Sequence, residues 1–190
     1  VPKKLMVNAA DFKDYLADSV GFGWELGSTT FSWEKFLRSK NREIDRLENR
    51  YYNNLQTNGV KIFRSRAKVL SPNKIQLTDG RIYQSKIILI ATGSRPFVPN
   101  FSGYEYVTTS NDIFDMEKLP SRMLIVGGGY IASEFAGIFN GMGVNVLQTY
   151  RGDKLLRGFD NDIREHLTVS MIDRGINVLC GVEVLKCQKD

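Results

Sequence analysis

The sequence has few of the residues that build metal and thiol chemistry. It contains two cysteines and one histidine in 190 residues. Cys180 and Cys187 lack the C-x-x-C spacing of zinc and dithiol sites, and two cysteines in a chain of this size do not form a disulfide scaffold. His166 lies away from every motif described below, so we expect it to be structural or exposed. These scarcities predict no metal site and a reducing, cytoplasmic setting.

Long apolar runs and a strong charge of one sign are also missing. No run approaches the roughly 20 residues of a transmembrane helix, so we predict no membrane partner. The net charge is +5, and most of the excess lies between Phe31 and Leu70. Arginines there recur every four residues, which is typical of a solvated helix face, although they could also attract an anionic ligand. No groove-reading motif accompanies them, so we predict no nucleic-acid partner.

Hydrophobic periodicity predicts alternating helices and strands, which indicates an α/β fold. Asp79-Gly80 is a hairpin signal, and the apolar run 87–90 is typical of a strand buried on both faces. Residues 94–120 hold three of the five prolines and form a predicted connector. The predicted helices cover residues 3–17, 31–56, 129–140 and 160–173. The predicted strands cover residues 60–70, 74–77, 81–83, 86–91, 123–126, 144–149, 176–179 and 182–185.

The segment after strand 123–126 has the spacing Gly127-x-Gly129-x-x-Ala132. This spacing alone is a weak signal, but its place between a strand and a helix makes it strong. Gly127 permits the tight turn, Gly129 lets a pyrophosphate approach the backbone, and Ala132 lets helix and strand pack closely. The helix N-terminus adds free N–H groups and the positive end of a dipole. The motif predicts a dinucleotide site, and the alternative is a glycine-rich turn that packs without a ligand.

The end of the second strand indicates which dinucleotide binds. NAD sites usually carry an acid there, which holds the ribose 2′-OH. Here Tyr150 takes that place, Arg151 follows it, and Arg157 comes soon after. Guanidinium groups suit a 2′-phosphate. Asp153 is the one contrary residue, and its position in a loop need not bring it inward. We therefore predict NADPH rather than NADH.

Several stretches of the sequence carry a specific resemblance. They are Val1-Pro2-Lys3-Lys4, Ala91-Thr92-Gly93, Gly127 through Glu134, and Arg151 through Asp160. In their order and spacing they resemble the pyridine-nucleotide disulfide oxidoreductase family over essentially the whole chain. The resemblance implies an α/β fold in three parts. Residues 1–93 would be part of an FAD-binding domain, 94–120 a connector, and 121–190 an incomplete, doubly wound NADPH-binding domain.

The resemblance also implies roles toward FAD. Lys3 corresponds to the family lysine beside the flavin ring. Glu134 corresponds to its charge partner, which a buried cation requires. Ala67 corresponds to the residue whose backbone meets the adenine. Thr92 and Gly93 correspond to a turn near FAD, where the backbone passes close to the cofactor.

Further correspondences concern NADPH and the substrate. The implied NADPH contacts are Gly127, Gly129, Tyr130, Ile131, Glu134, Arg151 and Arg157. Tyr130 corresponds to the tyrosine that covers the nicotinamide pocket until the cofactor binds. Tyr51 corresponds to a tyrosine at the disulfide-substrate site, and core packing on the apolar helix face is the competing interpretation. Asn54 agrees with the family members that reduce glutathione disulfide.

The implied activity is NADPH- and FAD-dependent reduction of a disulfide, with glutathione disulfide as the substrate of a homodimer. The family's redox pair, C-x-x-x-x-C, comes directly before its Val-Pro-Lys-Lys stretch, which here is residues 1–4. Neither that pair nor the family's His-Pro catalytic base occurs in this sequence. We therefore expect the chain to be the cofactor-handling middle of a reductase. A trypanothione or lipoamide reductase, and a nucleotide-binding fragment without turnover, are the alternatives.

Overall fold

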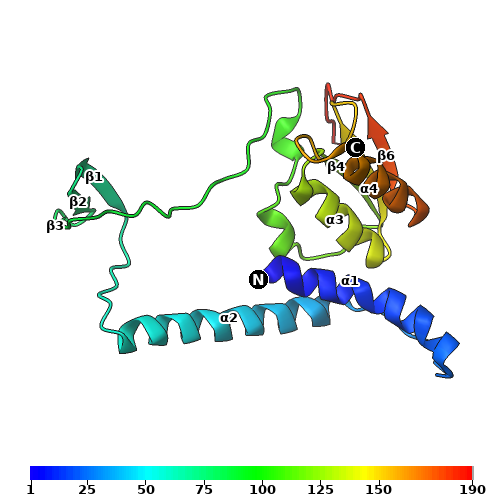
Figure 1. The fold of residues 1–190 in the computed structure, drawn as a ribbon, viewed down its shortest axis with the longest axis horizontal. Coiled ribbons are helices and arrows are strands. Elements are labelled where there is room, and N and C mark those ends of the chain that lie inside the picture. The colour runs from blue at the N-terminus through cyan, green and yellow to red at the C-terminus, as the bar shows by residue number, and fades with distance from the viewer. Residues whose placement is uncertain (190) are drawn as a thin grey trace. The chain divides into compact units, whose positions relative to one another are not determined.

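A computed structural model describes residues 1–189, which form two compact units (Figure 1). One unit combines Val1–Ile44 with residues 96–189, and the other is Asp45–Arg95. Helix α2, Trp33–Thr57, begins in the first unit and continues into the second. The predicted boundaries at residues 93 and 120 stay predictions, because compactness does not show which cofactor a segment binds.

The first unit contains a three-stranded parallel sheet with strand order β4-β5-β6. Thr149 of the central strand pairs with Val126 on one side and Leu179 on the other, so the carboxyl ends of the strands meet at one edge. In open α/β sheets, ligands bind at that edge. The predicted α/β fold class is confirmed. The elements are β4 Arg122–Val126, α3 Tyr130–Gly141, β5 Asn145–Tyr150, α4 Asn161–Asp173 and β6 Asn177–Cys180.

The core of this unit lies against one face of the parallel sheet. In β4, Met123 and Ile125 pack against the core, whereas Leu124 and Val126, which alternate with them, are exposed. This alternation is expected because successive side chains of a strand point to opposite faces. Full burial of one large apolar side chain stabilises a fold by about 1.5–3 kcal/mol. Fully inaccessible core residues are Met6, Ala136, Phe139, Val146 and Leu155.

Helix α1, Pro2–Ser19, packs closely on α3 within the same unit. Pro2 suits the first turn of a helix, where its missing N–H costs nothing. A Cβ atom added at Gly141 would lie 2.8 Å from the Cβ of Ala10, so the two helices approach at a distance that only glycine allows. This packing brings Lys3, at the start of α1, to the first turns of α3.

The start of α2 is also anchored in this unit. The Oγ of Ser32 accepts the N–H of Lys35 at 3.3 Å and caps the helix. The indole Nε1 of Trp33, which is buried, donates to the carbonyl of Met116 at 2.7 Å. The predicted connector, residues 94–120, contains the short 3-10 helices η2 Tyr104–Tyr106 and η3 Asp112–Asp115. A further 3-10 helix, η1 Val20–Phe22, ends α1.

The second unit holds an antiparallel sheet of order β1-β2-β3. The hairpin predicted at Asp79-Gly80 joins β2 to β3 and is confirmed. Gly80 has a φ of 88°, which is in the left-handed region, and Asp79 pairs with Arg81 at 2.6 Å. The strands are β1 Ala67–Ser71, β2 Lys74–Leu77 and β3 Ile82–Gln84.

Three strand predictions are wrong in whole or in part. Residues 60–66 are not a strand, because β2 is only four residues long and offers partners to residues 67–71 alone. Residues 86–91 form no strand, and Ile87 and Leu89 are 82% and 86% exposed. Residues 182–185 are also irregular. The cause is shared: a strand forms only where a neighbouring strand accepts its N–H groups and donates to its carbonyls.

Some residues singled out in the sequence have ordinary surroundings. His166 lies on α4 and is exposed. Cys180 ends β6, and burial raises the pKa of its thiol. Within residues 1–189, no three side chains of the metal-binding types gather at one place. None of the helices in this range is both long and apolar enough to cross a bilayer.

Candidate functional site

The glycine turn, Gly127–Gly129, connects β4 to α3 at the carboxyl edge of the parallel sheet. The N–H of Gly127 donates to the carbonyl of Thr149 at 2.8 Å and extends the ladder by one residue. Gly127 has a φ of 153°, which side chains rarely adopt. A Cβ atom there would also lie 3.2 Å from the Cβ of Ala132. Position 127 therefore needs glycine for its backbone and for the packing of α3 on β4.

Two hydrogen bonds hold the carbonyl groups of the turn. The buried side chain of Gln148 donates from Nε2 to the carbonyl of Gly127 at 2.8 Å. The N–H of Leu156 donates to the carbonyl of Gly128 at 2.6 Å. In a trans peptide the C=O and N–H groups point in opposite directions. The N–H groups of Gly128 and Gly129 therefore point away from Gln148 and Leu156.

Space for a ligand opens at Gly129, the N-cap residue of α3. A Cβ atom added at Gly129 would meet no atom within 4 Å, whereas one added at Gly128 would lie 2.3 Å from the Cγ of Tyr150. Within residues 1–189 the N–H groups of Gly128 and Gly129 have no hydrogen-bond acceptor. Open space, free donors and the positive end of the α3 dipole fit an anionic group such as a pyrophosphate.

The basic loop, residues 151–160, follows β5 and contacts the glycine turn through Leu156. Arg151 and Arg157 are exposed, and in the described part of the chain neither forms an ion pair or hydrogen bond. Lys154, by contrast, pairs with Glu165, and its hydrogen bond lowers the pKa of that carboxyl. The loop therefore keeps two guanidinium groups available for a ligand anion.

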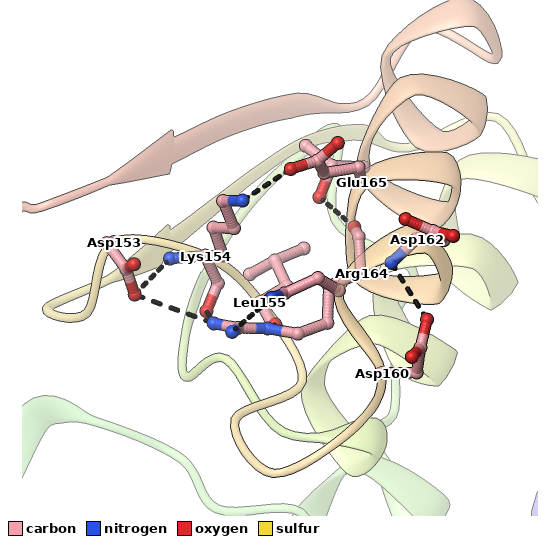
Figure 2. Close-up of polar contacts among 9 residues, drawn as sticks. Asp153, Lys154, Leu155, Asp160, Asp162, Arg164 and Glu165 are labelled. Atoms are coloured by element: carbon pink, nitrogen blue, oxygen red, sulfur yellow. Dashed lines mark hydrogen bonds and ion pairs between the residues drawn. The ribbon is translucent and has the colours of Figure 1, made fainter.

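Asp153 of the basic loop lies beside Arg164 of α4 (Figure 2). An Oδ1 atom of Asp153 lies 3.5 Å from Nη2 of Arg164. Arg164 also donates from Nε to the carbonyl of Leu155 at 2.7 Å and from Nη2 to the carbonyl of Lys154 at 2.9 Å. Asp160 caps α4, since its Oδ1 accepts the N–H of Asp162 at 2.9 Å. Of the two carboxylates in this loop, Asp153 therefore lies near the guanidinium of Arg164, and Asp160 is engaged as the cap of α4.

A second group of predicted residues meets where α1 packs on α3. Lys3 forms an ion pair with Glu134, and its Nζ lies 5.4 Å from the centre of the Tyr130 ring. The Lys3 ammonium thus forms an ion pair and also lies within cation–π range of the Tyr130 ring. Side-chain exposures of 31% and 44% for Lys3 and Glu134 leave the pair accessible. Ile131, in the first turn of α3, is also exposed. Their roles toward FAD and NADPH stay predictions.

The remaining predicted cofactor residues lie in the second unit. Ala67 begins β1 and pairs with Leu77. Thr92 and Gly93 are exposed in a segment without regular structure. Gly93 has a φ of 71°, so its backbone requires glycine whether or not a cofactor lies nearby. Their contacts with FAD stay predictions.

Tyr51 lies on the second half of α2 and is 60% exposed. It lines a hollow on the helix surface with Leu47, Arg50 and Asn54. Polar and cationic groups thus accompany the ring, which suits a polar, charged substrate. The substrate role of Tyr51 stays a prediction.

Sequence reasoning missed three residues that organise the glycine turn and the basic loop. Gln148 supports the glycine turn, Leu156 joins the basic loop to it, and Arg164 holds the loop from α4. Gln148 offered one signal, because a polar residue within an apolar strand needs a buried partner. Leu156 and Arg164 offered none, since a leucine in a loop and an arginine on a helix are ordinary residues there and do not indicate which groups they contact.

The chain is similar to known proteins over its whole length. Residues 1–190 match the pyridine nucleotide-disulphide oxidoreductase family. A glutathione reductase from Burkholderia cepacia is 43% identical over 189 residues, which cover 100% of this chain and 42% of that relative. A trypanothione reductase from Leishmania donovani is 37% identical over 204 residues, covering 100% of this chain and 42% of that relative.

A solved structure shares the fold. It is the HOCl-induced flavoprotein disulfide reductase RclA from Escherichia coli, with a TM-score of 0.78 and 22% identity. The match covers 97% of this chain and 40% of that one. The chain spans about two fifths of the length of the curated relatives above. With a family match over its whole length, the chain belongs to the pyridine nucleotide-disulphide oxidoreductase family.

Proposed function

We propose that the complete protein oxidises NADPH and reduces a disulfide with the help of FAD. The observation that carries the proposal is the nucleotide site, where open space at Gly129 and free N–H groups accompany the unpaired guanidinium groups of Arg151 and Arg157. Such a site suits a dinucleotide with an additional phosphate. Family membership supports the flavin and the disulfide.

The residues proposed for FAD are Lys3, Ala67, Thr92 and Gly93. FAD, when bound, passes reducing equivalents from the nicotinamide to the disulfide. Lys3 would place a positive charge beside the ring system, and Glu134 would hold that ammonium in position. Tyr130 would cover the nicotinamide pocket while it is empty, since its ring is exposed at the start of α3.

The preference for NADPH over NADH is tested by Arg151→Met and Arg157→Met in the full-length protein. Each change removes a charge-assisted hydrogen bond to the 2′-phosphate, which contributes about 1.5–3 kcal/mol. NADP+ binding should weaken by about tenfold or more, and NAD+ binding should change little. Arg122→Met is the matched control, because Arg122 is exposed at the opposite end of the strands. A preference for NADH in the unaltered protein would refute this part of the proposal.

We propose glutathione disulfide as the substrate. Asn54 lines the same hollow as Tyr51, and the similar protein from Burkholderia cepacia is a glutathione reductase. NADPH consumption should be faster with glutathione disulfide than with trypanothione disulfide or lipoamide. Tyr51→Ala should raise the KM for the disulfide. Tyr15→Ala is its control, because Tyr15 is a similarly exposed tyrosine of α1. Faster turnover with trypanothione disulfide would select the trypanothione alternative.

A nucleotide-binding protein without redox turnover is the alternative of a different class. Intact mass and flavin absorbance of the purified protein distinguish the two. Yellow colour with NADPH-dependent disulfide reduction supports the reductase, and NADP+ binding by a colourless protein supports the alternative.

We also propose a homodimer in the cytoplasm. Sedimentation as a monomer would contradict the first part, and fractionation of the cell tests the second.

A further inference from the structure

Arg164 is unusual among the cations near the nucleotide site, because it contacts main-chain atoms rather than solvent. Its side chain is only 13% exposed. Its Nε donates to the carbonyl of Leu155 and its Nη2 to the carbonyl of Lys154, at 2.7 and 2.9 Å. Nη1 donates to Oδ1 of Asn161 at 3.2 Å. The guanidinium therefore spans two successive carbonyls of the basic loop from its place on α4 (Figure 2).

The same stretch of loop is fixed from its other side by Leu156. Leu156 has a φ of 53° and is the one residue other than glycine in residues 1–189 with a positive φ. A left-handed backbone is unfavourable for a residue with a side chain, so neighbouring contacts must hold it. The N–H of Leu156 reaches the carbonyl of Gly128 at 2.6 Å, and Leu155 beside it is fully buried. The loop is thus held between α4 and the glycine turn.

The two free guanidinium groups flank this held stretch. Arg151 precedes Asp153, and Arg157 directly follows Leu156. Because residues 154–156 are tied at both sides, and the carbonyl of Gly152 accepts the N–H of Gly181 at 2.8 Å, the main chain beside Arg157 and Arg151 is held without a ligand. Prior positioning of this kind strengthens binding, since little conformational entropy is lost when the ligand binds. Arg164 also lies 3.5 Å from Asp153, whose side chain is 85% exposed, so this ion pair is weak beside the two main-chain contacts.

We propose that Arg164 is a positioning residue for the choice of NADPH. It would touch neither nucleotide, and it would act by holding Arg151 and Arg157 in place for a 2′-phosphate. This inference rests on the proposed function, because it assumes that those two arginines bind that phosphate. Lysine cannot replace Arg164, because one ammonium does not match the planar fork that bridges two carbonyls.

The test measures binding of NADP+ and NAD+ by calorimetry to the full-length protein carrying Arg164→Lys or Arg164→Met. We expect NADP+ binding to weaken by about 10- to 100-fold, by analogy with the loss seen when the residues that orient the ligands of a metal site are removed. NAD+ binding should change by less than about twofold, which also shows that the site is folded. In turnover, the KM for NADPH should rise while kcat at saturation stays the same.

Controls separate this inference from the function beneath it. Arg174→Lys makes the same substitution at the exposed C-cap of α4 and should leave both affinities unchanged. Hydrogen exchange at the Leu156 amide should accelerate in Arg164→Met and not in Arg174→Lys. Equal loss of both nucleotides, or loss of neither, would overturn the role of Arg164. If Arg151→Met and Arg157→Met also leave NADP+ binding intact, it is the proposed NADPH preference that fails.

Discussion

Alanine at Gly128 should lower the stability of the fold, whereas alanine at Gly129 should leave stability nearly unchanged and weaken nucleotide binding. A Cβ atom at Gly128 would lie 2.3, 2.4 and 2.6 Å from the Cγ, Cδ1 and Cδ2 atoms of Tyr150. The ring cannot slide aside easily, because a Cβ atom at Gly152 would already lie 2.5 Å from its Cε1. Tyr150 is thus confined between two glycines, and the new methyl group must displace it or the turn.

The expected cost of Gly128→Ala is about 2–3 kcal/mol, toward the upper end for overpacking, because both neighbours are rigid. For a chain of this length each kcal/mol lowers Tm by about 2–4 °C, so Tm should fall by about 4–12 °C. In Gly129→Ala no atom lies within 4 Å of the added Cβ, and the φ of −88° suits alanine. Lower entropy of the unfolded chain favours that variant by about 0.4–1 kcal/mol. Alanine is the poorer N-cap by a similar amount, so Tm should stay within about 2 °C.

Gly129→Ala should weaken nucleotide binding even though it leaves stability nearly unchanged. Its methyl group enters the space proposed for the pyrophosphate, which NADPH and NADH share, so both nucleotides should bind at least about tenfold more weakly. Calorimetry with NADP+ and NAD+ measures this, and a thermal melt measures stability. Tyr150→Ala combined with Gly128→Ala should cost less than the sum of the single changes, because the collision is then absent. An unchanged Tm for Gly128→Ala, or undiminished binding by Gly129→Ala, would refute the geometry of the turn.

Three further predictions concern contacts around the site. Asp160→Ala removes the N-cap of α4 and should lower the free energy of unfolding by about 1 kcal/mol, as measured by a thermal melt. Asp160→Asn should retain most of that stability, because its amide oxygen can accept the same N–H. Lys3→Met should change stability by about 1 kcal/mol or less, because the Lys3–Glu134 pair is partly exposed. In the FAD-loaded protein, however, the same variant should slow flavin reduction by NADPH in stopped-flow traces, and an unchanged rate would argue against a place beside the flavin. Hydrogen bonds from the Thr109 N–H and hydroxyl lower the pKa of Asp112, so that contact stabilises the fold above the ordinary carboxyl pKa and is lost as pH falls through the lowered value. The protection of the Thr109 amide, taken relative to its intrinsic exchange rate at each pH, should therefore fall in acid, and Asp112→Asn should remove most of that pH dependence.

Local patterns predicted the elements that make their own hydrogen bonds or carry strong turn signals. The four helices lie within a few residues of their predicted ranges, and the Asp79-Gly80 hairpin is present. The failures are strands. The apolar run 87–90 has the composition of a buried strand, yet Ile87 and Ile90 are exposed and pair with no strand of the described residues. A helix closes its bonds within itself, whereas a strand depends on partners that its own sequence does not contain.

The sequence by itself determined the glycine turn, because the turn out of the strand needs glycine at position 127 and the spacing to Gly129 is typical of a dinucleotide site. It also indicated the two arginines for a 2′-phosphate. Only the tertiary structure decided which charged side chains of the loop are unpaired. Lys154 forms an ion pair with Glu165, and Asp153 lies near Arg164. Arg151 and Arg157 are unpaired in the described chain. The reason is physical, since whether a charge is available depends on which groups distant in sequence come within a few ångströms of it, and spacing along the chain does not specify that.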